Sequence, residues 1–130
     1  MYEALTHKIR VAVTPRFVDE RSSQEEGYFF WAYTVEIANE GERTVTLLSR
    51  CWRITDANGK QEIVRGPGVV GQTPTLEPGQ SFTYTSGCPL ATPSGIMVGS
   101  YHMQCEDGQM LKVAIPAFSL DSPYTIRSIN

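Results

Sequence analysis

The amino-acid sequence predicts an all-β fold: an antiparallel β-sandwich of the immunoglobulin or fibronectin type III kind, with about seven strands. Three observations support this prediction. Apolar and polar residues alternate in short runs, turn-forming residues separate those runs, and no segment carries the apolar stripe of an amphipathic helix. Such strands bury one face each when two sheets pack together, although a partly open barrel would satisfy the same pattern.

The first two strands are expected over residues 8–18 and 28–38. The first places Ile9, Val11 and Val13 on one face. The second should form the centre of the core, because one of its faces holds only large apolar side chains, namely Phe29, Trp31, Tyr33, Val35 and Ile37. A polar loop over residues 19–27 joins the two strands, and Asn39-Glu40-Gly41 turns the chain afterwards.

The third strand, over residues 44–55, alternates imperfectly. Its apolar residues fall on both faces of a regular strand. Val45 and Leu47 are odd-numbered and lie on one face, whereas Leu48, Trp52 and Ile54 are even-numbered and lie on the other. One inserted residue exchanges the two faces of a strand, so we expect a β-bulge near Leu47 and Leu48.

The later strands are shorter and more widely separated. Asp56-Ala57-Asn58-Gly59 has the composition of a tight hairpin turn. The strands expected after it cover residues 60–65, 80–86, 96–106 and 110–118, with a loop over residues 87–95. Residues 1–130 then form a single domain with its core over about residues 8–120, and residues 121–130 have the composition of a short C-terminal tail.

Composition excludes several classes of function. The chain has 130 residues, with 11 basic and 14 acidic side chains and no long run of either sign, so it offers no electrostatic footprint for nucleic acid. No apolar stretch approaches the ~20 residues that cross a bilayer, so we expect no membrane insertion. Three widely separated cysteines and an N-terminus without an apolar signal core favour a reducing cytoplasm.

The segment from Gly66 to Gly71 has the spacing G-x-G-x-x-G of dinucleotide-binding loops. That motif works when a helix follows it and its N-terminus meets the pyrophosphate, with an acidic residue about 20 positions later. Pro74 and Pro78 prevent such a helix, and no acidic residue lies between Pro78 and Cys105. The sequence therefore argues against a Rossmann-type cofactor site.

Three interpretations of this segment stay open. It is a purely structural loop; or its backbone N–H groups at Gly66, Gly68 and Gly71, aided by Arg65, bind phosphate weakly; or it contacts a protein partner. The third interpretation rests on Val69 and Val70, consecutive apolar residues of which at least one should face solvent or a partner. The edge strands of an open sandwich could also add a strand from a partner or form a homodimer.

The sequence gives little support for a catalytic site or a metal site. His102 and Cys105, followed by Glu106 and Asp107, supply metal-ligating groups, but side chains three positions apart on a strand face opposite sides. His7 is the only other histidine, and no G-x-S-x-G elbow presents a serine nucleophile. We therefore expect no metal, no cofactor and no enzymatic activity.

Specific blocks of the sequence resemble the bacterial ApaG proteins, from about Val11 to Leu120. These blocks are Tyr33-x-Val35-x-Ile37-x-Asn39, Leu48-x-Arg50-x-Trp52-x-Ile54-Thr55-Asp56-Ala57-Asn58-Gly59, Val64-x-Gly66-x-Gly68-Val69-Val70-Gly71, Leu76-x-Pro78-Gly79-x-x-Phe82-x-Tyr84-Thr85-Ser86-Gly87 and Thr92-Pro93-x-Gly95-x-Met97-x-Gly99-x-Tyr101-x-Met103.

The resemblance implies a fibronectin type III-like sandwich. It also implies an association with cobalt resistance and magnesium efflux, without an established enzymatic activity. Related domains in eukaryotic F-box and polymerase-interacting proteins look like protein-interaction modules. We therefore expect a non-enzymatic binding module whose protein partner takes part in divalent-cation homeostasis, the alternatives being a binder of phosphate-containing metabolites and a direct metal sensor.

Overall fold

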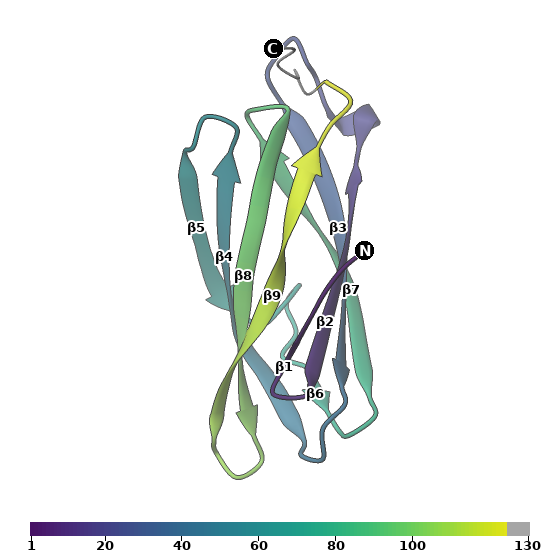
Figure 1. Ribbon diagram of the computed structural model, residues 1–130, viewed down its shortest axis with the longest axis vertical. Coiled ribbons are helices and arrows are strands. Elements are labelled where there is room, and N and C mark those ends of the chain that lie inside the picture. The colour runs from purple at the N-terminus through teal and green to yellow at the C-terminus, as the bar shows by residue number, and fades with distance from the viewer. Residues whose placement is uncertain (125–130) are drawn as a thin grey trace.

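The computed structural model describes residues 1–124, which form two antiparallel sheets packed face to face (Figure 1). The first sheet has the order β1-β2-β3-β7, with β1 at Tyr2–Thr6, β2 at Ile9–Phe17, β3 at Phe29–Asn39 and β7 at Ser81–Leu90. The second has the order β5-β4-β8-β9, with β4 at Val45–Asp56, β5 at Gln61–Pro67, β8 at Ser94–Cys105 and β9 at Met110–Asp121. The predicted sandwich is confirmed.

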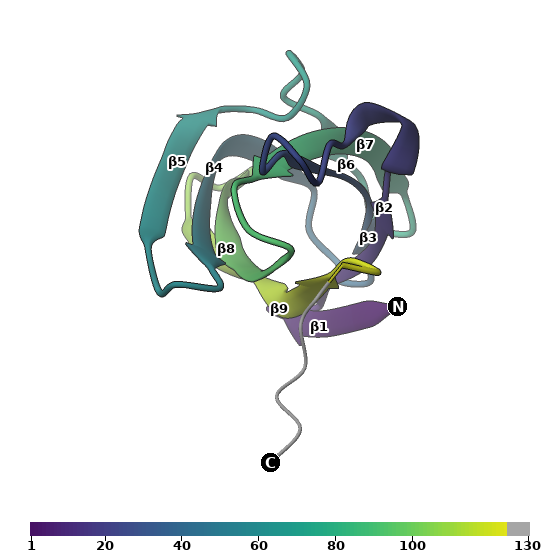
Figure 2. The ribbon, with the colours of Figure 1, turned by 90° about the horizontal axis from the view of Figure 1, so that it is seen from above.

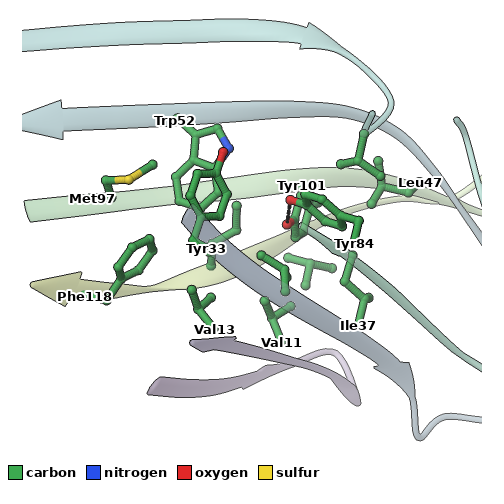
Figure 3. Close-up of a cluster of buried hydrophobic side chains, with 14 of the residues drawn as sticks. Val11, Val13, Tyr33, Ile37, Leu47, Trp52, Tyr84, Met97, Tyr101 and Phe118 are labelled. Atoms are coloured by element: carbon green, nitrogen blue, oxygen red, sulfur yellow. Dashed lines mark hydrogen bonds between the residues drawn. The ribbon is translucent and has the colours of Figure 1, made fainter. Parts of the chain in front are cut away.

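Strand β3 supplies the centre of the core, as its alternation predicts. Its inward residues are all buried, and Val35 and Ile37 have no exposed surface. They face residues of the opposite sheet, including Trp52, Met97, Tyr101 and Phe118 (Figure 3). The rings of Tyr33 and Trp52 meet edge to face, with centroids 5.3 Å apart.

The bulge expected in β4 is present. The register of β4 against β8 shifts between Leu47 and Ser49. Val45 and Leu47 are therefore buried before the shift, and Trp52 is buried after it. The first residues of β4 pair with the two-residue strand β6 (Thr75–Leu76), whereas the residues after the bulge pair with β5. The bulge thus divides β4 between two partners.

The structure corrects the expected boundaries. Within residues 1–124 there are nine strands instead of seven, because Tyr2–Thr6 and Thr75–Leu76 also pair. The loop expected over residues 87–95 is wrong for most of its length, since β7 continues to Leu90 and β8 begins at Ser94. A 3-10 turn, η1 (Asp19–Arg21), interrupts the predicted polar loop.

The C-terminal end of the described chain is packed against the sandwich. Asp121 ends β9, and Ser122 is only 5% exposed. The Tyr124 hydroxyl donates to Asp19 Oδ1 at 3.1 Å, and its ring centroid lies 6.1 Å from that of Phe17. The predicted tail is therefore docked up to Tyr124, and its residues 125–130 lie outside the described residues.

The two lateral sides of the sandwich differ. On one side, which we call the closed seam, β1 and β2 pack against β9. The Ala114 N–H in β9 donates to Thr6 Oγ1 in β1 at 3.2 Å, and the rings of Tyr2 and Phe118 lie 5.9 Å apart. On the other side, the open seam, β5 and β7 end their sheets, and no backbone pairing joins them within residues 1–124. Figure 2 shows the loop that follows β5 at this side.

Candidate functional site

The glycine-rich segment lies at the open seam and leads into a tight hairpin instead of a helix. The Val69 N–H donates to Gln72 O at 2.8 Å, and the Gln72 N–H donates back to Val69 O at 2.9 Å. The two residues between them, Val70 and Gly71, have φ angles of 42° and 80°. Two positive φ angles at the centre of a two-residue turn define the type I′ hairpin.

Gly68 is required by the geometry of this hairpin. Its φ is +57°, and a Cβ atom at this position would lie 2.2 Å from the carbonyl oxygen of Gln72. The clash involves backbone, which has little room to move. The glycine of the motif therefore allows the chain to fold back on itself rather than to approach a phosphate.

Arg50 holds the hairpin against β4. Its Nη1 donates to Pro67 O at 3.0 Å and to Gly68 O at 2.9 Å. A Cβ atom at Gly66 would lie 3.0 Å from Arg50 Nη2, so the absence of a side chain at Gly66 lets the guanidinium lie across β5. Arg50 thus fixes the start of the hairpin to β4 through two hydrogen bonds, and we call this side chain the latch.

The backbone donors that a phosphate would need are largely engaged. The Gly68 N–H donates to Leu48 O at 2.8 Å. Hydrogen-bonded pairs alternate along an antiparallel ladder, so the Arg50–Gly66 pair two residues earlier is also a hydrogen-bonded pair. Pro67 has no N–H. Of the donors expected at Gly66, Gly68 and Gly71, the first two are therefore directed at β4.

Arg65, the side chain expected to aid an anion site, lies elsewhere. It is exposed and lines a hollow of about 490 Å³ on the outer face of the second sheet, together with His102 and Lys112. Gly66 and Pro67 line the same hollow, whereas Val69, Val70 and Gly71 line a different cavity.

Val69 and Val70 have opposite environments. Val69 has no exposed surface and belongs to the core, whereas Val70 is 53% exposed. One of the two valines faces solvent, as the sequence predicts, and it is Val70. Val69 belongs to the core cluster and also lines a cavity of about 340 Å³ beside the hairpin.

Two cavities lie under the hairpin between the sheets, and we call them together the inter-sheet cleft. The first, about 340 Å³, is lined by residues that include Val70, Tyr84 and Ser86. The second, about 240 Å³, is lined by residues that include Trp52, Glu62, Val64 and Cys88. Tyr33, Arg50 and Ser86 line both cavities, so these residues lie where the two meet.

The cleft contains a buried donor without a partner. Within residues 1–124, the buried side-chain nitrogens that lack a hydrogen bond are Nε1 of Trp31 and Nε1 of Trp52. Trp52 is 2% exposed and lines the second cavity. A buried donor left unpaired costs about 1–3 kcal/mol. An acceptor within hydrogen-bond reach of this N–H would recover that cost.

Three titratable groups that line the cleft, Tyr33, Tyr84 and Cys88, have raised pKa values. Burial raises the pKa of Tyr33 and, further, that of Tyr84, whose hydroxyl is hydrogen-bonded to that of Tyr101. Burial also raises the pKa of the Cys88 thiol to about 11, so little thiolate forms near neutral pH. Tyr33, Tyr84 and Cys88 therefore stay protonated near neutral pH.

The expected geometry of the possible metal ligands is confirmed. His102 is exposed and Cys105 is 3% exposed, so the two side chains lie on opposite faces of β8. No three His, Cys, Asp or Glu side chains within residues 1–124 gather closely enough to hold a metal ion. Among the same residues, no helix has the length and apolar character needed to cross a membrane.

The sequence did not identify Arg50 as a latch or Trp52 as part of a cleft. Residues two positions apart on a strand share a face, so the sequence places Arg50 beside Trp52, but it does not show that the hairpin and β7 lie against that face. A cationic residue that shares its face with a core tryptophan is the signal that could have marked the position.

Comparison with known proteins gives a consistent result. A family model described as the ApaG domain matches residues 19–105. A protein named ApaG from Beijerinckia indica subsp. indica is 58% identical over 130 residues, which cover 100% of both chains. One from Brucella anthropi is 55% identical with the same coverage.

Solved structures agree with the sequence relatives. A crystal structure of an ApaA protein from Bordetella pertussis has a TM-score of 0.86 and 48% identity, and the match covers 90% of this chain and 95% of that one. The C-terminal domain of Wzt has a TM-score of 0.59 at 9% identity, over 96% of this chain and 79% of that one, and therefore shares the fold alone.

Proposed function

The chain belongs to the ApaG family, and from that premise we propose that it is a non-enzymatic binding module that acts through contact with a protein partner. The contact surface is the tip of the Val69–Gln72 hairpin together with the adjoining inter-sheet cleft. The family resemblance associates such a module with cobalt resistance and magnesium efflux, so the partner belongs to divalent-cation homeostasis.

Val70 carries this proposal. A β-branched residue with φ of 42° is a strained conformation that asparagine or glycine would adopt at lower cost. The side chain gains only partial burial in return, since it is 53% exposed. A residue that is unfavourable both for the turn and for its contact with water is explained by apolar contact with another protein.

Two features support the non-enzymatic and cytoplasmic parts of the proposal. The cleft offers hydroxyls and a thiol of raised pKa instead of an activated nucleophile. Cys51, Cys88 and Cys105 are all unpaired thiols, which suits a reducing compartment. A direct metal sensor and a phosphate binder receive less support, because ligand clusters and free loop donors are scarce in the described residues.

The test is capture of partners from the native cell, with and without cobalt, by the wild-type protein and by Val70→Asn. Asparagine tolerates the left-handed turn, so this variant should fold normally and lose the partner. The matched control is Ile96→Asn, which changes another exposed apolar residue, 51% exposed, outside the cleft. Equal recovery by wild type and Val70→Asn would contradict the proposal.

The phosphate alternative has its own measurement. Pyrophosphate added to millimolar concentration should leave the amide resonances of Gly66, Gly68 and Gly71 unchanged, because the first two N–H groups are directed at β4. Saturable shifts of these amides would favour the phosphate binder over the protein module.

A further inference from the structure

The free edge of β7 presents a row of unpaired backbone groups. The Asn39 N–H donates to Gln80 O at 2.9 Å, which fixes the phase of the β3–β7 ladder. Hydrogen-bonded pairs then recur at every second residue, so the N–H and C=O groups of the even-numbered residues of β7 point to β3. Those of Thr83, Thr85 and Gly87 point away from β3, toward the open seam.

This edge is accessible and has a defined length. Thr83, Thr85 and Gly87 are exposed residues, and β7 ends its sheet. Pro89 is next in the same phase, and it lacks an N–H, so pairing cannot continue beyond it. The free donors therefore stand two residues apart, at a spacing of roughly 7 Å, over a segment of about five residues.

A hollow follows the same edge along the inner side. The first cavity of the cleft includes Tyr84 and Ser86, and the second includes Ser86 and Cys88. A third cavity of about 370 Å³ continues along Pro89 and Leu90, facing Gln61 and Glu62 of β5. The inner face of β5 thus borders these cavities, and its half-buried Val64 lines the second of them together with residues of β7.

We propose that an extended peptide segment of the partner adds to β7 as a fifth strand of the first sheet and fills the inter-sheet cleft with its inward side chains. Free N–H and C=O groups at every second residue match the repeat of an extended polypeptide and of no other common ligand. This inference rests on the proposed function, and it specifies how the module binds.

The pattern of the peptide follows from the cleft. Alternate side chains of the added strand point inward, and those over Val64 and Pro89 meet apolar surface. An inward side chain that carries an oxygen acceptor would pair with Trp52 Nε1, the buried donor that lacks a partner. The Val69–Gln72 hairpin lies at one end of the cleft, so Val70 can touch the same segment.

The experiment selects phage-displayed random linear heptapeptides on the full-length protein. We expect enriched peptides with alternating apolar residues. Thr85→Pro removes one free N–H from the β7 edge and should weaken them about tenfold, in line with the loss of one hydrogen bond. Thr85→Ala keeps the backbone N–H and removes the γ-methyl group and the hydroxyl, which lies 2.9 Å from Thr34 Oγ1, and it should bind normally.

A second control and a second readout keep the result decisive. Arg65→Pro makes the same change at the free edge of β5, where the Arg65 N–H also points away from β4, and should leave binding intact. In the wild-type protein, a synthetic copy of an enriched peptide should slow hydrogen exchange at Thr83, Thr85 and Gly87. This measurement needs no folded proline variant.

The outcomes separate the two proposals. No enrichment, equal binding by wild type and Thr85→Pro, or unprotected β7 amides would overturn strand addition; so would a dimer of this chain that occupies β7. If partner capture depends on Val70 but not on Thr85→Pro, the module stands and strand addition fails. If peptides bind β7 but Val70→Asn captures the cellular partner as well as the wild-type protein does, strand addition is supported and the hairpin contact is overturned.

Discussion

The closed and the open seams of the sandwich are built from similar strands but end differently. At the closed seam, rings from β1 and β9 meet and the Ala114 N–H bonds to Thr6. At the open seam, β7 and β5 leave backbone groups unpaired, and cavities of about 240 to 370 Å³ lie between them. The core is thus closed along one side, and the binding that we propose uses the other.

The largest loss of stability should come from substitution of a core residue next to the closed seam. Phe118 is 1% exposed and contacts the rings of Tyr2, Tyr33 and Trp52. Phe118→Ala should lower the free energy of unfolding by about 3–5 kcal/mol, measured by urea denaturation. Val64→Ala at the open seam should cost only about 1 kcal/mol, since its side chain is half-buried. Equal losses would contradict the comparison.

Alkaline pH should destabilise the protein through its buried acids. Burial raises the folded-state pKa of Cys88, Tyr84 and Tyr101 above the unfolded-state values. Stability is therefore complete below pH 9, and it falls as pH rises while the unfolded chain alone loses protons. Each group contributes a slope of about 1.4 kcal/mol per pH unit, first Cys88 between pH 9 and about 11, then the tyrosines above pH 10.

Urea titrations at pH 8, 9.5 and 10.5 measure this slope. Cys88→Ala should flatten the curve between pH 9 and 10.5, although it lowers stability overall. If the slope of stability against pH is unchanged in this variant, water reaches the Cys88 thiol in the folded protein. The open seam would then admit more water than the 4% exposure of Cys88 indicates.

The hairpin at the open seam should be sensitive to a single methyl group. Gly68→Ala introduces a side chain at φ of +57° and 2.2 Å from Gln72 O. We expect a loss of about 2 kcal/mol in the free energy of unfolding, from backbone strain and displacement of the loop. Gly71→Ala is the matched control, because it shares a positive φ but meets no atom within 4 Å, and its loss should be smaller.

The smallest effect should have the opposite sign. Val70→Asn relieves the strained turn and should raise the free energy of unfolding by up to about 1 kcal/mol. Val69→Asn places a polar group in the core and should lower it by about 2 kcal/mol. A destabilised Val70→Asn would show that Val70 serves the fold, and would remove the reason to assign it to a partner.

Much of this architecture follows from the sequence because burial on a strand has a period of two. The face of β3 from Phe29 to Ile37 predicts the core, and the parity change in β4 predicts the bulge after Leu47. Pro74 and Pro78 exclude a helix after Gly71, because proline supplies no N–H to an initial turn. These features depend only on neighbours along the chain.

Other features were decided by tertiary structure. Strand Tyr2–Thr6 has weak alternation and exists through pairing with β2 and contact with β9. Val69 and Val70 are the same type of residue, and only the hairpin places the side chain of Val69 in the core and that of Val70 toward solvent. The latch of Arg50 and the unpaired Nε1 of Trp52 require segments far apart in the chain to meet, which no local pattern specifies.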